Sequence, residues 1–377
     1  MKILILSSNN GSGHNSAGGA VAEQFQALGI PCEIRDAVSF RSRKLSAVIR
    51  WLHVNGAMHA PWLFKIGNSA AYRPRRGRSL CYRATSLLSR PISDYVRENH
   101  FDTVVCTHIF AALAVTHARR QNMLDVPAYF IPTDYDRVPY VEETALDGYF
   151  IPHPDLAAEY AAAGIPPERI HPTGIPVMAR FARRIPQQEA RRLLNLPLSG
   201  SIVLFMGGSM GFGKLKSMVR NALQRGPGNM SVVVLTGSNH ELYDDLKRQY
   251  GFDRVIPAGY TDQVDMYMDA ADVLLTKPGG LSTTEAAVKG VAMIHTDPIP
   301  GWETDNARFF QRLGLSRTGS SADEYIGEAL DLLASPDARG EMIALQHRHI
   351  NQNAARDICR VVVGEEETGG RGNGENA

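Results

Sequence analysis

The chain has 377 residues, of which 44% are hydrophobic and 21% are charged, and its formal net charge is +1 at pH 7. These values describe a globular chain long enough for two domains, and so balanced a charge does not by itself indicate a partner. The first apolar run, Ile3 to Leu6, is too short for a signal peptide, and no later run reaches about 18 apolar residues, so we expect no membrane-spanning helix.

Apolar strands and helices alternate along the chain in the order expected of a parallel sheet. In the first half, the sequence predicts a helix over 16–28 and strands at 2–6, 32–35, 103–106, 128–131 and 148–151. A second series of strands is predicted at 201–205, 231–235, 255–257, 273–276 and 292–295. We therefore predict an α/β fold with two Rossmann-like domains facing across a cleft, with ligands at the carboxyl ends of the strands.

The domain limits follow from composition. Segment 174–188 is rich in proline and arginine and predicts a hinge, so we place the N-terminal domain at 1–175 and the C-terminal domain at 176–350. A C-terminal helix that returns to the N-terminal domain is expected at 351–363. The last segment, 364–377, has almost no apolar side chains and is predicted to be disordered.

A polar loop with two glycines, Gly11 and Gly13, follows the first predicted strand and ends at His14. Dinucleotide binding is one interpretation, because Asp36 follows about twenty residues later, but Ser16 stands where that motif needs its last glycine. A histidine at the end of such a loop fits that interpretation poorly.

The span between Asp36 and Asp94 contains no acidic residue. Its basic residues are interleaved with aromatic and aliphatic ones, a pattern that suits insertion into an anionic lipid surface. A buried helix with a solvated basic loop is the simpler alternative, and a nucleic-acid surface is another. The candidate membrane residues are Arg50, Trp51, Trp62, Phe64, Arg73, Arg75, Arg76 and Arg78.

Two glycine-rich turns follow strands of the second series. One contains Gly207, Gly208, Ser209, Met210 and Gly211, and its small residues allow close approach to a diphosphate. It is not a Walker loop, because Leu215 follows Lys214.

The second turn, Pro278-Gly279-Gly280, leads into a predicted helix whose first turn carries hydroxyl residues and Glu285. Backbone N–H groups at a helix start attract an anion, and a carboxylate placed there can hold a ribose diol. An ordinary turn between a strand and a helix is the alternative, but the two turns together indicate a nucleotide-sugar site.

These motifs belong to a longer series in the same order. It comprises SSNNGSGHNSA at 7–17, VVCTHIFAA at 104–112, IPTDYD at 131–136, GIPV at 174–177, GGSMGFGK at 207–214, LTGSN at 235–239, the segment 259–286 and PIPGWETDNA at 298–307. In this series the chain resembles the MurG-like glycosyltransferases (family 28), most closely the monogalactosyldiacylglycerol synthases and processive diacylglycerol glucosyltransferases. The resemblance covers most of 1–360 and implies a GT-B architecture.

The resemblance implies an inverting transfer, in which an acceptor hydroxyl attacks the anomeric carbon of a UDP-sugar in a single displacement. Asp134 is the favoured base, with His14 orienting the acceptor or binding an anionic lipid, although the two roles could be exchanged. The residues expected on the acceptor side are Gly11, Gly13, His14, Asn15, Thr107 and His108.

The donor side is expected to bind the uracil through the backbone near Tyr260 and the ribose through Glu285. Relatives usually carry glutamine before Glu303, where this chain has Trp302, so the transferred sugar stays open. The expected donor residues are Gly207, Gly208, Ser209, Met210, Gly211, Thr236, Gly237, Tyr260, Thr261, Lys277, Pro278, Gly279, Gly280, Ser282, Thr283, Thr284, Glu285, Trp302, Glu303 and Asn306.

No DxD-type carboxylate pair follows a predicted strand, so we predict a metal-independent reaction without a cofactor, in which the UDP-sugar is a co-substrate. Four widely separated cysteines favour a reducing compartment. The resembled family uses its N-terminal domain for lipid contact. We therefore expect a cytoplasmic enzyme, peripheral on the inner face of the cell membrane, whose partners are a UDP-sugar, a diacylglycerol or glycolipid acceptor and an anionic membrane surface, but no nucleic acid.

Three other functions remain open at this stage. A transferase of the same fold could act on a polyprenyl-linked or other acceptor, and a non-catalytic membrane sensor could bind a UDP-sugar. A UDP-sugar 2-epimerase shares the architecture, but the hydrophobic N-terminal domain argues against it.

Overall fold

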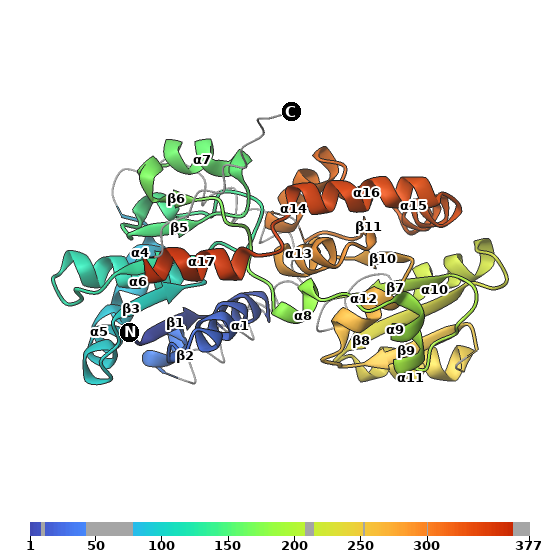
Figure 1. Ribbon diagram of the computed structural model, residues 1–377, viewed down its shortest axis with the longest axis horizontal. Helices are drawn as coiled ribbons and strands as arrows, with labels where there is room; N and C mark the ends of the chain where they lie inside the picture. The colour runs from blue at the N-terminus through green and yellow to red at the C-terminus, as the bar shows by residue number, and fades with distance from the viewer. Residues whose placement is uncertain (9–11, 43–77, 208–214, 252, 300, 365–377) are drawn as a thin grey trace, which may run out of the picture.

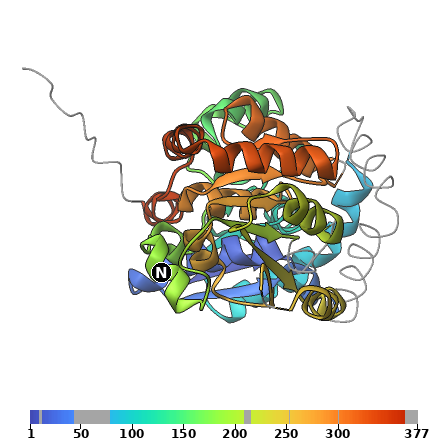
Figure 2. The same cartoon turned by 90° about the vertical axis from the view of Figure 1, so that its right-hand side faces the viewer.

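The computed structural model describes residues 1–8, 12–42, 78–207, 215–251, 253–299 and 301–364. Two lobes are visible, each built on a six-stranded parallel sheet with helices on both faces (Figures 1 and 2). The strand orders are β2-β1-β3-β4-β5-β6 in the N-terminal lobe and β12-β11-β10-β7-β8-β9 in the C-terminal lobe. In each lobe the strand order reverses beside the lobe's first strand in sequence, β1 or β7. In open α/β sheets, ligands bind at such a switch point, in the crevice outside the carboxyl ends of the strands.

The strands of the N-terminal lobe are β1 (Ile3–Ser7), β2 (Cys32–Asp36), β3 (Thr103–Cys106), β4 (Ala128–Phe130), β5 (Gly148–Phe150) and β6 (Ile170–His171). Its helices are α1 (Ser12–Ala27), α4 (Leu80–Thr85), α5 (Ser89–Glu98), α6 (Ile109–Arg120) and α7 (Ala157–Ala162). Short 3₁₀ turns are η1 (Ala37–Phe40), η2 (Ser86–Leu88), η3 (Val141–Glu143), η4 (Pro154–Leu156) and η5 (Pro167–Arg169).

The strands of the C-terminal lobe are β7 (Ile202–Met206), β8 (Ser231–Gly237), β9 (Val255–Gly259), β10 (Val273–Thr276), β11 (Ala292–His295) and β12 (Arg317–Thr318). Its helices are α8 (Ala179–Ala182), α9 (Gln187–Leu193), α10 (Leu215–Arg225), α11 (His240–Tyr250), α12 (Val264–Ala270), α13 (Gly280–Lys289), α14 (Trp302–Arg312), α15 (Ala322–Ala334) and α16 (Pro336–His349). The final helix, α17 (Ala354–Val363), lies on the N-terminal lobe (Figure 1).

The central strands form elements that are buried on both faces. Every residue of β1, β3, β7, β10 and β11 is buried, as expected for parallel strands covered by helices on both sides. In the N-terminal lobe, alternate residues of β1 face two different clusters, with Leu4 and Leu6 on one side and Ile3 and Ile5 on the other. This alternation fixes the register of the sheet, because a shift of one residue would exchange the two cores.

The chain passes between the lobes twice, at 172–178 and at 350–353. Asn351 Nδ2 joins the two crossings by donating to the carbonyl of Thr173 at 2.8 Å and to Asp357 Oδ2 at 2.8 Å. Gly174 has a φ of +94°, and a Cβ there would lie 3.3 Å from the Cβ of Ala354, so the crossings are in close contact. The two crossings between the lobes therefore pack against each other.

The predicted strands 103–106, 273–276 and 292–295 have the observed bounds, and the other predicted strands differ from the structure by one or two residues at an end. One boundary was wrong: α1 begins at Ser12, so Gly13 and His14 lie in its first turn rather than in a loop. The glycines and asparagines of this segment are weak helix formers, but packing of α1 against the sheet outweighs that preference. The predicted disordered tail lies outside the described residues apart from Gly364.

Candidate active site

The carboxyl ends of the two sheets face each other, and the lobes touch there. Gly280, the first residue of α13, packs against the backbone of Thr133, which follows β4. A Cβ at Gly280 would lie 1.9 Å from the carbonyl oxygen of Thr133, so the sequence can place only glycine at this contact. Gly13 of α1 lies opposite Leu281, where a Cβ would have an ordinary contact of 3.7 Å.

On the N-terminal side, the first turn of α1 holds His14 against the ends of β3 and β4. His14 Nδ1 lies 2.8 Å from the carbonyl oxygen of Thr107 and 3.1 Å from Thr133 Oγ1. The ring of His108 meets that of His14 edge-on, with 4.6 Å between centroids. The structure therefore brings together three residues predicted for the acceptor side.

The contact with Thr107 fixes the tautomer of His14. A carbonyl oxygen can only accept, so Nδ1 carries the hydrogen and Nε2 is the unprotonated nitrogen of the neutral ring. Burial lowers the pKa of His14 to about 4, with the Thr107 carbonyl opposing the shift. At pH 7 the imidazole is neutral, which favours orientation of a hydroxyl over binding of an anionic lipid.

Asp134 lies at the contact between the lobes. Its Oδ1 accepts a hydrogen bond of 2.9 Å from Nδ2 of Asn306, a fully buried residue of α14. Burial raises the pKa of Asp134, as does the charge of Asp136, whereas the bond from Asn306 lowers it. A carboxylate with a raised pKa is a stronger base than an ordinary aspartate.

The hydroxyls of the first turn of α13 do not all face the crevice. Thr283 and Thr284 are fully buried, and their hydroxyls lie 3.3 Å from His295 Nε2 and 2.8 Å from the hydroxyl of Tyr135. Ser282 is partly exposed. Of the three hydroxyl residues predicted to contact the donor, the structure exposes Ser282 and uses the other two inside the fold.

Glu285 lies further along α13 and is partly exposed. Burial raises the pKa of Glu285 to about 8, opposed by the charge of Arg180 and increased by that of Asp265. This carboxyl therefore holds its proton to a higher pH than an ordinary glutamate does.

Glu303, in the first turn of α14, is oriented by the backbone. Its Oε2 accepts a hydrogen bond of 2.6 Å from the N–H of Ile299, and a Cβ at Gly279 would lie 3.9 Å from its Oε1. Burial raises the pKa of Glu303, while the Ile299 bond and the charge of Lys277 lower it. Glu303 thus lies beside the Pro278-Gly279-Gly280 turn, and its role toward the donor stays a prediction.

Comparisons with known proteins agree with this arrangement. Residues 14–177 match the model of the monogalactosyldiacylglycerol (MGDG) synthase family, and residues 202–317 match that of the glycosyltransferase family 28 C-terminal domain. The chain belongs to the MurG-like glycosyltransferases of family 28.

A curated relative of this family 28 glycosyltransferase is the processive diacylglycerol beta-glucosyltransferase of Staphylococcus carnosus (strain TM300). It is 25% identical over 347 residues, which cover 90% of this chain and 87% of that protein. Among solved structures, MurG of Acinetobacter baumannii has a TM-score of 0.64 at 14% identity, covering 96% of this chain and 99% of that one. A UDP-GlcNAc 2-epimerase from Neisseria meningitidis bound to UDP-GlcNAc has a TM-score of 0.62 at 13% identity, with coverage of 97% and 100%. These structural likenesses establish the GT-B fold, as predicted.

Other predicted donor residues that the structure describes lie at the ends of β7, β8 and β9. Gly207 follows β7 and is buried, and Gly237 ends β8 with a φ of +58°. Thr236 is fully buried, and its hydroxyl donates to the carbonyl of Ala258 at 3.2 Å, so it supports β9. Tyr260 is 77% exposed. Thr261 is partly exposed, and its hydroxyl accepts from the N–H of Gln263 at 3.0 Å.

Several predicted residues lie outside the described part of the chain: Gly11, Gly208, Ser209, Met210, Gly211, Arg50, Trp51, Trp62, Phe64, Arg73, Arg75 and Arg76. The backbone of Trp302 begins α14, but its side chain is not described. Asn15 is used within the N-terminal lobe, where its Oδ1 accepts a hydrogen bond of 2.6 Å from the hydroxyl of Ser7.

One predicted membrane residue, Arg78, is described and exposed, and it lies over the ring of Tyr82 at 4.7 Å. The structure adds neighbours that the sequence did not single out. Leu80 is 80% exposed and Leu87 is 62% exposed. Exposed arginines, Arg83 and Arg90, lie on the same segment. None of the helices in the described residues has the length and apolar character needed to cross a bilayer.

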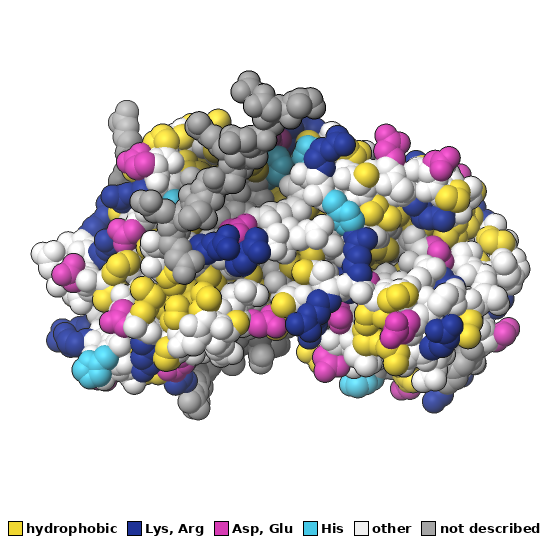
Figure 3. Space-filling view, in the orientation of Figure 1, with side chains coloured by type: hydrophobic (Ala, Val, Ile, Leu, Met, Phe, Trp, Pro, Cys, Tyr) yellow, Lys and Arg dark blue, Asp and Glu magenta, His cyan; other side chains and the backbone are white. Residues whose placement is uncertain are grey.

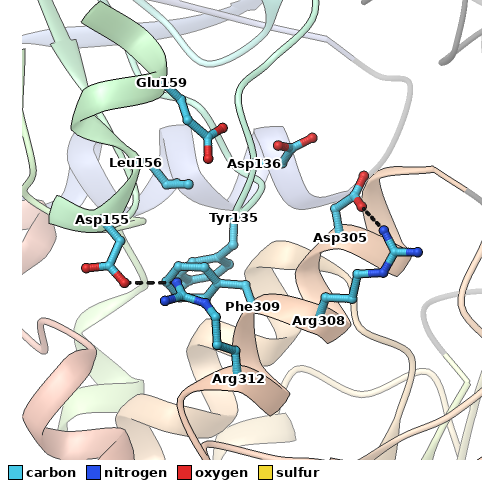
Figure 4. Close-up of a pocket in the computed structure, with 9 residues that line it drawn as sticks. All are labelled: Tyr135, Asp136, Asp155, Leu156, Glu159, Asp305, Arg308, Phe309 and Arg312. Carbon is cyan, nitrogen blue, oxygen red and sulfur yellow. Dashed lines mark hydrogen bonds and ion pairs between the residues drawn. The ribbon is translucent and has the colours of Figure 1, made fainter.

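A cavity of about 570 Å³ opens between α7 and α14, next to Tyr135 (Figure 4). Its carboxylates include Asp136, Glu159 and Asp305, and Arg312 of α14 donates to Asp155 of the N-terminal lobe at 2.9 Å. The excess of carboxylates makes this cavity a poor site for a diphosphate, and it contains none of the predicted site residues. Within the described residues, no group of three acidic, histidine or cysteine side chains is placed to hold a metal ion.

Proposed function

We propose that this protein is an inverting, metal-independent transferase that moves a hexose from a UDP-sugar to a hydroxyl of diacylglycerol or a glycolipid at the inner face of the cell membrane. The observation that supports it most strongly is the pairing of the two family models with the contact at Asp134. The N-terminal match is to a lipid-modifying family, and Asp134 lies where the acceptor side meets the donor side.

In this mechanism the acceptor oxygen attacks the anomeric carbon as the bond to the UDP oxygen breaks. The hydroxyl proton passes to Asp134 Oδ2, because Oδ1 is engaged by Asn306. His14 Nε2, neutral and unprotonated, accepts a hydrogen bond from the acceptor hydroxyl as it enters, and the hydroxyl then turns its single proton to Asp134 for the reaction. The two bases therefore have different tasks, and Asp134 keeps the role expected from the sequence.

The leaving UDP needs positive potential. The N-terminus of α13, the Gly279-Gly280 turn and Lys277 lie at the donor edge of the sheet and supply backbone N–H groups, a helix dipole and a cation. These groups would take the place of a divalent metal. Glu285 would accept hydrogen bonds from the ribose hydroxyls as a carboxylate, so donor binding would release its proton.

Membrane contact is supported by the exposed leucines and arginines of 78–90. We call this stretch the α4 segment, although it runs from α4 through η2 into the first turn of α5. Each basic residue close to an anionic surface contributes about 1 kcal/mol, and Leu80 and Leu87 are exposed enough to enter the interface. On the coloured part of the face in Figure 3, basic and acidic side chains are interspersed, which agrees with the small net charge. The α4 segment, in contrast, has arginines without acidic neighbours in sequence.

A donor panel tests the proposal. The purified protein is mixed with vesicles of diacylglycerol and anionic phospholipid, and no divalent metal is added. UDP-glucose, UDP-galactose, UDP-N-acetylglucosamine and UDP-glucuronate are tested separately as donors. Mass spectrometry of the lipids should show a hexose-sized gain with one donor and none with Asp134→Asn. Tight UDP binding without any lipid product would contradict the proposed acceptor and favour another acceptor or a sensor.

A further inference from the structure

Asn306 was expected to contact the donor, but its side chain is fully buried between the lobes. Its Nδ2 donates to Asp134 Oδ1 at 2.9 Å and to the carbonyl of Pro278 at 3.0 Å, and its Oδ1 accepts from the N–H of Tyr135 at 2.6 Å. Both amide hydrogens are therefore used by the protein, which leaves no donor for a sugar hydroxyl.

The orientation of this amide is unambiguous. A backbone N–H faces one end and a backbone carbonyl faces the other, so a flipped amide would place oxygen against the Pro278 carbonyl and nitrogen against the Tyr135 N–H. The group that faces Asp134 is thus an N–H donor. A donor at this position holds the carboxylate in one rotamer and favours its ionised form.

The two partners of the bond belong to different lobes. Asn306 comes from α14 of the C-terminal lobe, and Asp134 follows β4 of the N-terminal lobe. Two further contacts hold the same junction without touching Asp134: the hydroxyl of Tyr135 lies 2.8 Å from Thr284 Oγ1, and Gly280 packs on Thr133. The lobes would therefore stay in contact if the Asn306 amide were removed.

We propose that Asn306 is a positioning residue that orients the carboxylate of Asp134 for proton abstraction and makes this orientation depend on contact between the lobes. The inference rests on the proposed function, because it assigns Asn306 a task in that reaction. Through Pro278, the same amide ties the base to the turn that faces the donor. The base is then complete only when the donor lobe is in place.

The test compares Asn306→Asp, Asn306→Ala and Tyr135→Phe with the wild type, using the donor found active in the panel. The aspartate variant keeps the shape of the side chain but replaces the donor with an oxygen. Both Asn306 variants should lower kcat by about 10- to 100-fold at pH 7 while changing the donor KM less. Loss of the donor also raises the pKa of Asp134, so the acidic limb of the kcat profile should move to higher pH in both.

Tyr135→Phe is the matched control, because it removes another bond across the junction and leaves the one to Asp134. Its acidic limb should coincide with that of the wild type. An equal shift in Tyr135→Phe would overturn the inference in favour of lobe contact alone, and an effect on donor KM with unchanged kcat would make Asn306 a donor contact. Melting temperature and UDP calorimetry accompany each variant, and loss of folding in both Asn306 variants would assign the residue a purely structural role. A wild type without transfer activity would refute the proposed function itself, which is a separate outcome.

Discussion

The two sides of the crevice differ in how their ionisable groups are held. On the N-terminal side, His14 and Asp134 each have a short hydrogen bond to a fixed partner, the carbonyl of Thr107 and the amide of Asn306. On the C-terminal side, Glu303 is held by the N–H of Ile299, but Glu285 interacts only at longer range with Arg180 and Asp265. His14, Asp134 and Glu303 are therefore oriented by the protein itself, whereas Glu285 is the group whose proton we expect a bound ligand to displace.

The largest effect is expected from Asp134→Asn, which keeps the shape of the prearranged side but removes its base. kcat should fall by about 10²- to 10⁴-fold, because an amide cannot take the hydroxyl proton. UDP affinity measured by calorimetry should be retained. If the variant turned over near the wild-type rate, Asp134 would not be the base, and His14 would be the remaining candidate.

Gly280→Ala tests whether the contact between the two sides is required. Its Cβ would lie 1.9 Å from the carbonyl oxygen of Thr133, so the lobes must move apart, and a displacement of about 1 Å can cost about 100-fold in kcat. Gly340→Ala in α16 is the control, because a Cβ there meets nothing within 4 Å. Equal activity of the two variants would show that the lobes need not touch.

The two lobes can also be compared by how much exposed arginines on each contribute to binding of anionic vesicles. Arg83→Gln combined with Arg90→Gln should weaken binding to anionic vesicles by about 2 kcal/mol, or roughly 30-fold, and more at low salt. Arg192→Gln, on an exposed part of α9 in the C-terminal lobe, should leave cosedimentation unchanged. Equal losses in the two proteins would remove the α4 segment from the interface.

The smallest effect is expected from the pH dependence of donor binding. Burial raises the pKa of Glu285 to about 8, so the carboxylate that we propose accepts from ribose becomes more populated as the pH rises towards 8. The donor KM should fall about fivefold between pH 7 and pH 8 and level off about one pH unit above the pKa. Glu285→Gln should have a higher KM that does not change in this window, and a flat wild-type profile would remove Glu285 from the ribose site.

The sequence predicted the buried strands well, because uninterrupted apolar runs such as 273–276 are a strong signal. The edge strands β6 and β12 have two residues each, Ile-His and Arg-Thr, and carry no such signal. For the site, motif order indicated His14 and Asp134. The bond from Asn306 to Asp134 spans 172 positions, and no local pattern reports a partner that distant.

The hydroxyls of Thr283 and Thr284 illustrate the same limit. A run of hydroxyl residues at a helix start resembles a phosphate site, but successive residues of a helix face different directions. Here two of them meet His295 and Tyr135, which come from other segments of the chain. Residue type was informative, whereas the direction of each side chain required the packed structure.

The final helix has a consequence for how the protein is made. Ile358, Cys359 and Val362 of α17 are buried with Val21 and Phe25 of α1 in one cluster. During translation the N-terminal lobe emerges from the ribosome first, yet part of its core is supplied by the last helix to be synthesised. The acceptor lobe therefore exposes apolar surface until the donor lobe is complete, and a nascent chain that stops before 354 would leave the older lobe, rather than the newer one, unfinished.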